Sequence, residues 1–354
     1  MFSLPRPLLT RTFIGATTRR HYASATRPSP VHLLTLADLT AGQIHELLVS
    51  SAQHKRDAKH TDKPPPQPLR GKTMAIMFSK RSTRTRVATE SALACPRYVF
   101  GIAGYPAGRE RVAARHVHRG VEHGRRDHGQ GLWARGRRAR HSTVPIINAL
   151  SAKYHPTQLL ADLLTLHESA TNSLTPTSDY SAHKTHPSKT LPGLRVAWVG
   201  DGNNILNEML VSMPKLGVHL AAACPNGYTP DPDVVQIAKE DGKRTGAEVL
   251  LTTVPEEAVK SADVIVTDTW VSMGQETEKQ RRLKDFAGYQ ITMDLARRGG
   301  ANSGWKFMHC LPRKPEEVDD EVFYSDRSLV FPEAENRKWT ILAAIDALLV
   351  RGRF

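Results

Sequence analysis

The sequence predicts an α/β protein with two domains, each built on a central parallel sheet flanked by helices. Its 354 residues are enough for two domains of ordinary size, each with its own hydrophobic core. From Leu194 onward, short apolar segments alternate with helical patterns, which is typical of a parallel sheet with right-handed crossovers. Residues 169–192 are rich in Ser, Thr, His and Pro and lack apolar periodicity, so we interpret them as a linker or surface insertion.

We expect the first domain over residues 29–168, completed by a closing helix over 333–354. Its predicted elements are a helix capped by Thr40, a buried strand over 73–78, a helix ending near Leu93 and a short strand over 144–148. Pro156 suits the first position of the helix that follows. The closing helix carries Ile341, Leu342 and Ile345 on one face, so we expect it to pack back on this domain.

The second domain is expected over residues 193–332, where the alternation is regular. The predicted strands cover residues 194–199, 218–222, 248–251 and 264–267. Helices are predicted from about Ile205, near Val234 and from Pro255. We place Asp268 directly after the last strand of this sheet.

The formal charge of +14 is concentrated in two segments. Residues 1–28 hold five arginines and no acidic residue, which is typical of a mitochondrial transit peptide; a disordered basic tail is the alternative. Residues 96–140 hold eleven arginines and three acidic residues, and the rest of the chain is nearly neutral. The three cysteines form neither a disulfide framework nor a CxxC site, which fits a reducing compartment such as the mitochondrial matrix. No apolar stretch is long enough to span a membrane.

The block over residues 94–141 does not fit the first domain. It contains eight glycines and no lysine within 96–140, and it shows no apolar repeat from which a core could be built. A GC-rich gene read out of frame would produce this composition. Our hypothesis is that translation leaves the proper frame near Leu93 and regains it near His141. Genuine low-complexity disorder is the alternative.

A cluster of hydroxyl and guanidinium groups follows the first predicted strand. Ser82, Thr83, Arg84 and Thr85 begin a helix, where free backbone N–H groups and a guanidinium can converge on a phosphate dianion. An ordinary helix cap is the alternative interpretation. His155 and Gln158, which share one helical face, can hydrogen-bond a small carbonyl and an amide.

Three further motifs belong to the second domain. The DGNN motif at 201–204 follows a strand, where open parallel sheets bind ligands, although an Asn/Gly turn is the plain alternative. Asp268 is suited to an ammonium group and Ser272 to polar atoms, although Asp268 can also be a simple cap. Cys310 lies between His309 and Arg313, so we expect a reactive or ligand-contacting thiol in a cationic neighbourhood, although such a Cys is more often core.

Together the STRTR, HPTQ, DGNN, DTWVSMG and HCLPRKPEEVDDEVF stretches resemble the ornithine carbamoyltransferases. The resemblance covers roughly residues 30–90 and 142–354. Aspartate carbamoyltransferases share only the first two motifs. The resemblance implies two α/β domains, one for carbamoyl phosphate and one for ornithine, and a homotrimer with sites between subunits. It implies neither a metal nor an organic cofactor, and neither nucleic acid nor membrane as a partner.

The resemblance also implies roles for individual residues. Those implied to hold carbamoyl phosphate are Ser82, Thr83, Arg84, Thr85, His155, Gln158, Cys310, Leu311 and Arg337. Those implied to hold ornithine are Asn204, Asp268, Ser272 and Met273. Arg84, His155 and Cys310 are the expected catalytic residues, with Cys310 and Leu311 facing the reacting amine. The neutral δ-amine would attack the carbamoyl carbon while the site stabilises negative charge on the carbonyl oxygen and phosphate.

Two departures from the family pattern leave other functions open. A further carbamoyl-phosphate arginine of the family would fall inside the irregular block, where Arg135 stands in the wrong local pattern. Asn207 and Glu208 occupy positions where the family usually has His and Ser. A catalytically impaired ornithine-binding relative, or the product of a faulty gene model, is therefore one alternative. Nucleic-acid binding through the arginine-rich block is a remote one, because aromatic residues are sparse there.

Overall fold

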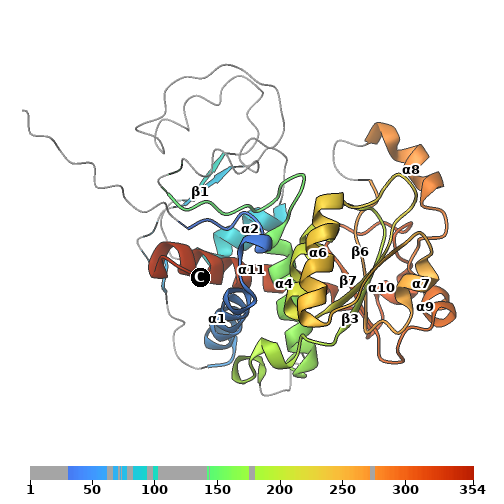
Figure 1. Cartoon of the computed structure of the whole chain (residues 1–354). Helices are drawn as coiled ribbons and strands as arrows, with labels where there is room; N and C mark the ends of the chain where they lie inside the picture. The colour runs from blue at the N-terminus through green and yellow to red at the C-terminus, as the bar shows by residue number, and fades with distance from the viewer. Residues whose placement is uncertain are drawn as a thin grey trace, which may run out of the picture.

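The computed structural model describes residues 31–61, 67–70, 72, 74–77, 83–93, 99–102, 142, 144–174, 180–271 and 276–354. They form two lobes, one with α1, α2 and α11 and the other with a five-stranded sheet, with α4 between them (Figure 1). The predicted leader at 1–28 and most of the irregular block lie outside these residues. Within the described part of the chain, no helix is long and apolar enough to cross a membrane.

The larger sheet is parallel throughout, in the order β5-β4-β3-β6-β7. Its strands are β3 (Arg195–Val199), β4 (His219–Ala223), β5 (Val249–Thr252), β6 (Val264–Thr267) and β7 (Lys306–His309). Chain order runs outward from β3 to β5 and then returns to β6, so β3 and β6 meet where the strand order reverses. Ligands bind at such a switch point, at the carboxyl ends of the strands.

Helices cover both faces of this sheet. They are α5 (Asn204–Ser212), α6 (Pro232–Thr245), α7 (Pro255–Val259), α8 (Lys279–Asp285), α9 (Met293–Gly299) and α10 (Asp320–Phe323). Val196 and Trp198 pack in one core with α5 and α6, whereas Ala197 and Val199 pack in a second core with α7 and α9. Neighbouring strand residues point to opposite faces, so a strand buried on both sides is a continuous apolar run.

The first lobe is mainly helical in its described part. It contains η1 (Leu36–Asp38), α1 (Ala41–Lys59), α2 (Thr83–Ala92), α4 (Pro156–Ala170), α11 (Val330–Asp346) and the parallel pair β1 (Met74–Met77) and β2 (Val99–Ile102). Thr40 caps α1 in a capping box with Gln43, as predicted. Pro156 stands in the first turn of α4, which is also confirmed. The closing helix α11 packs against α4, α1 and α2.

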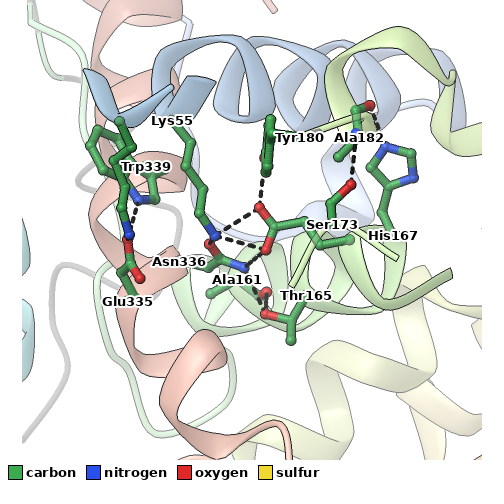
Figure 2. A network of polar contacts seen from close by, with 12 residues as sticks. Lys55, Ala161, Thr165, His167, Ser173, Tyr180, Ala182, Glu335, Asn336 and Trp339 are labelled. Atoms are coloured by element: carbon green, nitrogen blue, oxygen red, sulfur yellow. Dashed lines mark hydrogen bonds and ion pairs between the residues drawn. The ribbon is translucent and has the colours of Figure 1, made fainter. Parts of the chain in front are cut away.

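A buried set of polar side chains joins these helices, and we call it the lysine cluster: Lys55, Thr165, Glu168, Tyr180 and Asn336 (Figure 2). The Lys55 ammonium donates to Glu168 at 2.8 Å and to the Asn336 carbonyl oxygen at 2.8 Å. The Tyr180 hydroxyl donates to the same carboxylate at 2.6 Å. Opposite charges are thus matched inside the protein, where an unpaired charge would be costly.

Several sequence predictions about the fold were wrong. Residues 144–148 form no strand; Ile147 makes only an isolated bridge with Leu33, and Pro145 removes a donor that a strand would need. The sheet also continues beyond β6 to β7, so Asp268 does not follow its last strand. The short β7 sequence KFMH lacks β-branched residues, which explains why its pattern gave no signal.

The irregular block and the predicted linker each contain structure that the sequence did not indicate. Within the block, β2 pairs in parallel with β1 over four residues. Within 169–192, Tyr180 and Leu191 are buried, so this segment covers the core near α1 and α4 instead of only joining domains. Two short 3-10 helices, η3 (Ala182–Lys184) and η4 (Pro187–Lys189), lie here. Apolar periodicity cannot detect single anchoring residues between short turns.

Candidate active site

The buried guanidinium of Arg337 is the centre of a second polar set. Arg337 donates through Nη1 to the Gln158 carbonyl oxygen and through Nη2 to the Thr85 hydroxyl at 3.2 Å. Its Nε, also buried, has no hydrogen-bond partner among the described residues. Burial and the neighbouring Arg84 cation lower the pKa of Arg337 to about 10. A buried cation with a spare donor and a second cation beside it favours an anionic ligand.

Two carboxyl groups lie behind Gln158. The Gln158 amide nitrogen donates to Asp162 at 2.8 Å and to Glu333 at 2.7 Å. Burial, and next the Asp162 carboxylate, raise the pKa of Glu333, and burial likewise raises the pKa of Asp162. Two carboxylates this close cannot both ionise without large cost, so the pair shares a proton and titrates as a unit. We call Thr85, Gln158, Asp162, Glu333 and Arg337 the arginine cluster.

This arrangement fixes the orientation of the Gln158 amide. Its NH₂ group faces two acceptors, Asp162 and Glu333, so its carbonyl oxygen must face Arg337. A reversed amide would place its NH₂ group against the guanidinium donors. The carboxyl pair therefore contacts Arg337 only through a neutral amide, although Asp162 and Glu333 also act on the guanidinium charge from a longer distance and raise its pKa.

His155 and Arg84 lie next to this cluster. The His155 side chain is buried, and burial together with the cations Arg337 and Arg84 lowers its pKa well below the ordinary value. His155 is therefore neutral at physiological pH. Arg84 stands in the first turn of α2 and is exposed, and its charge acts on both His155 and Arg337. Arg84 and Arg337 therefore make one positively charged region around the neutral His155, near the starts of α2 and α4.

Cys310 and Leu311 follow β7 at the same place. The Cys310 thiol is buried near Asp268, Asp162 and Glu333, and burial followed by these acidic groups raises its pKa well above the ordinary value. The expected cationic neighbourhood is only part of the surroundings: Arg84 acts on the thiol, but burial and the acidic residues, which come from elements distant in sequence, outweigh it and keep the thiol protonated. The backbone N–H of Leu311 donates to the imidazole Nδ1 of His309 at 2.8 Å, and the backbone N–H of His309 donates to the Glu333 carboxylate at 3.1 Å.

The carboxyl ends of β3 and β6 bring a second group together. Asn203 caps α5 with its side-chain oxygen and donates through Nδ2 to Asp268 at 3.0 Å. Asn204 donates instead to the backbone oxygen of Ser151 at 2.7 Å. Gly202 is required by space, since a Cβ there would lie 2.4 Å from the backbone at Thr229. Burial raises the pKa of Asp268.

Four of the predicted ligand contacts cannot be placed: Ser82, Ser272 and Met273 lie outside the described residues, and Thr83 is described only as the first residue of α2. Arg135, to which no role was assigned, also lies outside the described residues. The remaining predicted residues gather at two places. Thr85, His155, Gln158, Cys310 and Arg337 lie with Arg84 around the arginine cluster, and Asp268 lies at the end of β6 near Cys310.

Sequence reasoning missed Asp162, Glu333 and Asn203. A signal was present for the first two, because Asp162 follows Gln158 by four residues and Glu333 precedes Arg337 by four, so each pair shares a helix face. Asn203 was passed over in favour of its neighbour Asn204. Helical spacing places residues on one face but does not say which faces from different helices meet.

Asp162, Cys310 and Glu333 form a group that could hold a metal ion, since one ligand atom of each lies within 4.8 Å of the others. Carboxylate and thiolate are ligands that Zn²⁺ accepts. Both carboxyl groups, however, already accept from the Gln158 amide, and the raised pKa of the thiol disfavours the thiolate. These residues therefore fit a shared proton better than a cation.

Family models match most of the chain. Residues 31–96 and 121–168 match the aspartate/ornithine carbamoyltransferase carbamoyl-P binding domain, and residues 192–348 match the Asp/Orn binding domain of the same family. The chain belongs to the aspartate/ornithine carbamoyltransferase family. The unmatched residues, 97–120, lie inside the irregular block over 94–141. They are fewer than the residues of that block, because the match to the family model resumes at residue 121. A reading-frame error is a hypothesis for residues 97–120.

Individual relatives extend over most of the chain. The mitochondrial ornithine carbamoyltransferase of Coccidioides immitis is 45% identical over 343 residues, covering 91% of this chain and 93% of that protein. The mitochondrial ornithine transcarbamylase of Gallus gallus is 44% identical over 332 residues, covering 90% and 85%. The crystal structure of the Coccidioides enzyme matches with a TM-score of 0.73, 40% identity and coverage of 91% and 98%. The Pyrococcus furiosus ornithine carbamoyltransferase structure also gives 0.73, at 35% identity, covering 90% and 97%.

Proposed function

We propose that this enzyme transfers the carbamoyl group of carbamoyl phosphate to the δ-amine of L-ornithine, giving L-citrulline and phosphate. The observation that carries the proposal is the buried Arg337, held by Gln158 and Thr85 with a spare donor and flanked by Arg84. A phosphate dianion would complete the charge balance of this region. The carbamoyl-P and Asp/Orn binding domains of the family, in that order, support both substrates.

The proposed mechanism assigns the described residues as follows. Arg84 and Arg337 bind the phosphate, while Arg84, Thr85 and His155 surround the carbonyl oxygen on which negative charge develops. Gln158 positions the carbamoyl amide. Cys310 and Leu311 face the ornithine amine, and Asp268 and Asn204 bind its amino-acid end together with Ser272 and Met273. Because His155 is neutral, it acts as a hydrogen-bonding group and not as a charged acid.

We also infer that the protein is a homotrimer in the mitochondrial matrix and needs no cofactor. The mitochondrial names of the relatives, together with the basic leader, support the compartment. The trimer rests on the resemblance to ornithine carbamoyltransferases, whose sites lie between subunits. Because Arg84 is exposed, a single chain leaves the site partly open. A subunit interface would cover this side of the site.

Purified full-length protein incubated with ornithine and carbamoyl phosphate tests the reaction. We expect citrulline formation, with a rate that rises with pH, because only the neutral amine can attack. A turnover independent of pH would contradict amine attack as the rate-limiting event. Ornithine binding by calorimetry without any citrulline would instead favour the impaired, ornithine-binding alternative.

A further inference from the structure

Glu208 is a buried carboxyl group for which the proposed mechanism has no role. It lies on α5 in the second domain, and it stands with Asn207 where the family usually has Ser and His. Burial raises its pKa to about 7, partly offset by the donors that surround it. Removing a carboxyl group from water costs free energy, so its burial needs a structural or functional reason.

The contacts of Glu208 all cross to the first domain. Its Oε1 accepts from the Thr35 hydroxyl at 2.9 Å and from the backbone N–H of Leu36 at 2.6 Å. Its Oε2 accepts from the backbone N–H of His155 at 3.1 Å. One carboxylate therefore binds both the N-terminus of η1 and the residue that begins α4. Hydrogen bonds to a charged acceptor are about twice as strong as neutral ones.

Asn207, next to Glu208, also makes a hydrogen bond to the first domain. Its amide nitrogen donates to the backbone oxygen of Lys153 at 3.2 Å, and its oxygen accepts from the backbone N–H of Asp231 at 3.3 Å. Both residues that depart from the family pattern thus hold the segment that leads into His155. His155 makes no side-chain capping bond to α4, so the backbone contact from Glu208 supplements a weakly capped helix start.

We propose that Glu208 is a positioning residue: by accepting a hydrogen bond from the His155 backbone across the domain boundary, it sets where the His155 imidazole meets carbamoyl phosphate. The inference rests on the proposed function for the identity of the substrate. A misplacement of about 1 Å at such a group can reduce turnover about a hundredfold.

Lys215 offers a matched control. It lies in the 3-10 helix η5 (Pro214–Leu216) that follows α5, and it donates to the backbone oxygens of Leu36, Ala37 and Leu39 at 3.2, 3.0 and 2.9 Å. Lys215 and Glu208 therefore hold the two ends of η1, but no contact joins Lys215 to His155 in the described structure. Removing Lys215 loosens the same domain boundary but leaves the hydrogen bond from His155 to Glu208 in place, although the Lys215 charge also acts on Glu208.

The experiment compares Glu208→Gln with Lys215→Met in the full-length protein. A glutamine keeps one acceptor, which suits the two donors of η1 and leaves its NH₂ group facing the N–H of His155. Hydrogen–deuterium exchange over residues 151–160 should be faster in Glu208→Gln and unchanged in Lys215→Met. We expect kcat/KM for carbamoyl phosphate to fall about tenfold to a hundredfold only in Glu208→Gln.

Equal exchange over residues 151–160 and equal turnover in the two variants would overturn the proposal. If the wild-type protein forms no citrulline, the proposed function fails, but exchange at this segment still decides the role of Glu208. Should Glu208→Gln not fold, Glu208→Asp keeps the charge and shortens the reach. Its exchange should be faster than that of the wild type, and wild-type exchange with wild-type turnover would equally overturn the proposal.

Discussion

The lysine cluster and the arginine cluster both include residues of α4 and α11, but they balance charge differently. Lys55 contacts Glu168 directly, and the neutral partners Tyr180 and Asn336 complete the set (Figure 2). Among the described residues, Arg337 hydrogen-bonds to the neutral Gln158 and Thr85, while two carboxyl groups compete for one proton behind the amide. A completed charge pair indicates a structural role, whereas an incomplete one indicates a place for a ligand.

The largest expected effect is on the stability of the lysine cluster. Replacing Lys55 with Met leaves the Glu168 carboxyl buried without its cation, so the free energy of unfolding should fall by about 3–5 kcal/mol. Urea unfolding followed by circular dichroism measures this change. The double variant Lys55→Met/Glu168→Gln should recover part of the loss. A Lys55→Met protein as stable as the wild type would show that the charge pair is not structural.

The arginine cluster should respond in the opposite way. Arg337→Met should reduce kcat/KM for carbamoyl phosphate by about 10²–10³-fold, because the variant loses a donor aimed at developing negative charge. Its free energy of unfolding should fall by less than that of Lys55→Met, since the variant loses hydrogen bonds to neutral groups and not a direct ion pair. Steady-state kinetics and urea unfolding on the same preparation separate the two effects. A large loss of stability with nearly intact turnover would make the two clusters alike.

The smallest effect concerns the shared proton. Burial raises the pKa of Asp162 to about 7, above the unfolded value near 4, so the folded protein binds more protons between these values. Its contribution to stability is therefore greatest in acid and falls as pH rises toward 7, by at most about 1.4 kcal/mol per pH unit. Asp162→Asn should flatten this part of the curve of unfolding free energy against pH.

Urea unfolding at several pH values between 5 and 8 measures that slope. Asp233→Asn, at an exposed carboxyl group on α6, is the control and should leave the slope as in the wild type. An unchanged slope in Asp162→Asn would mean that the carboxyl pair does not share a proton in the folded protein.

Much of the fold follows from the sequence by itself. The alternation of strands and helices after Leu194 predicted β3 to β6, and Thr40 and Pro156 marked the starts of α1 and α4. These features depend on neighbours along the chain, which is why local patterns reveal them. The motifs also predicted that Arg337, Gln158 and Thr85 belong to one site, through the family that they resemble.

Only the tertiary structure decided which charges are balanced. The sequence placed Cys310 beside His309 and Arg313 and so predicted a cationic neighbourhood, but α4 and α11 also bring Asp162 and Glu333 to the thiol, and these acidic groups outweigh the effect of Arg84 on its pKa. The same holds for Glu208, which appeared only as a departure from a pattern until its carboxylate was seen to hold His155. Burial and electrostatic interaction depend on distances in space, and residues far apart in the chain set those distances.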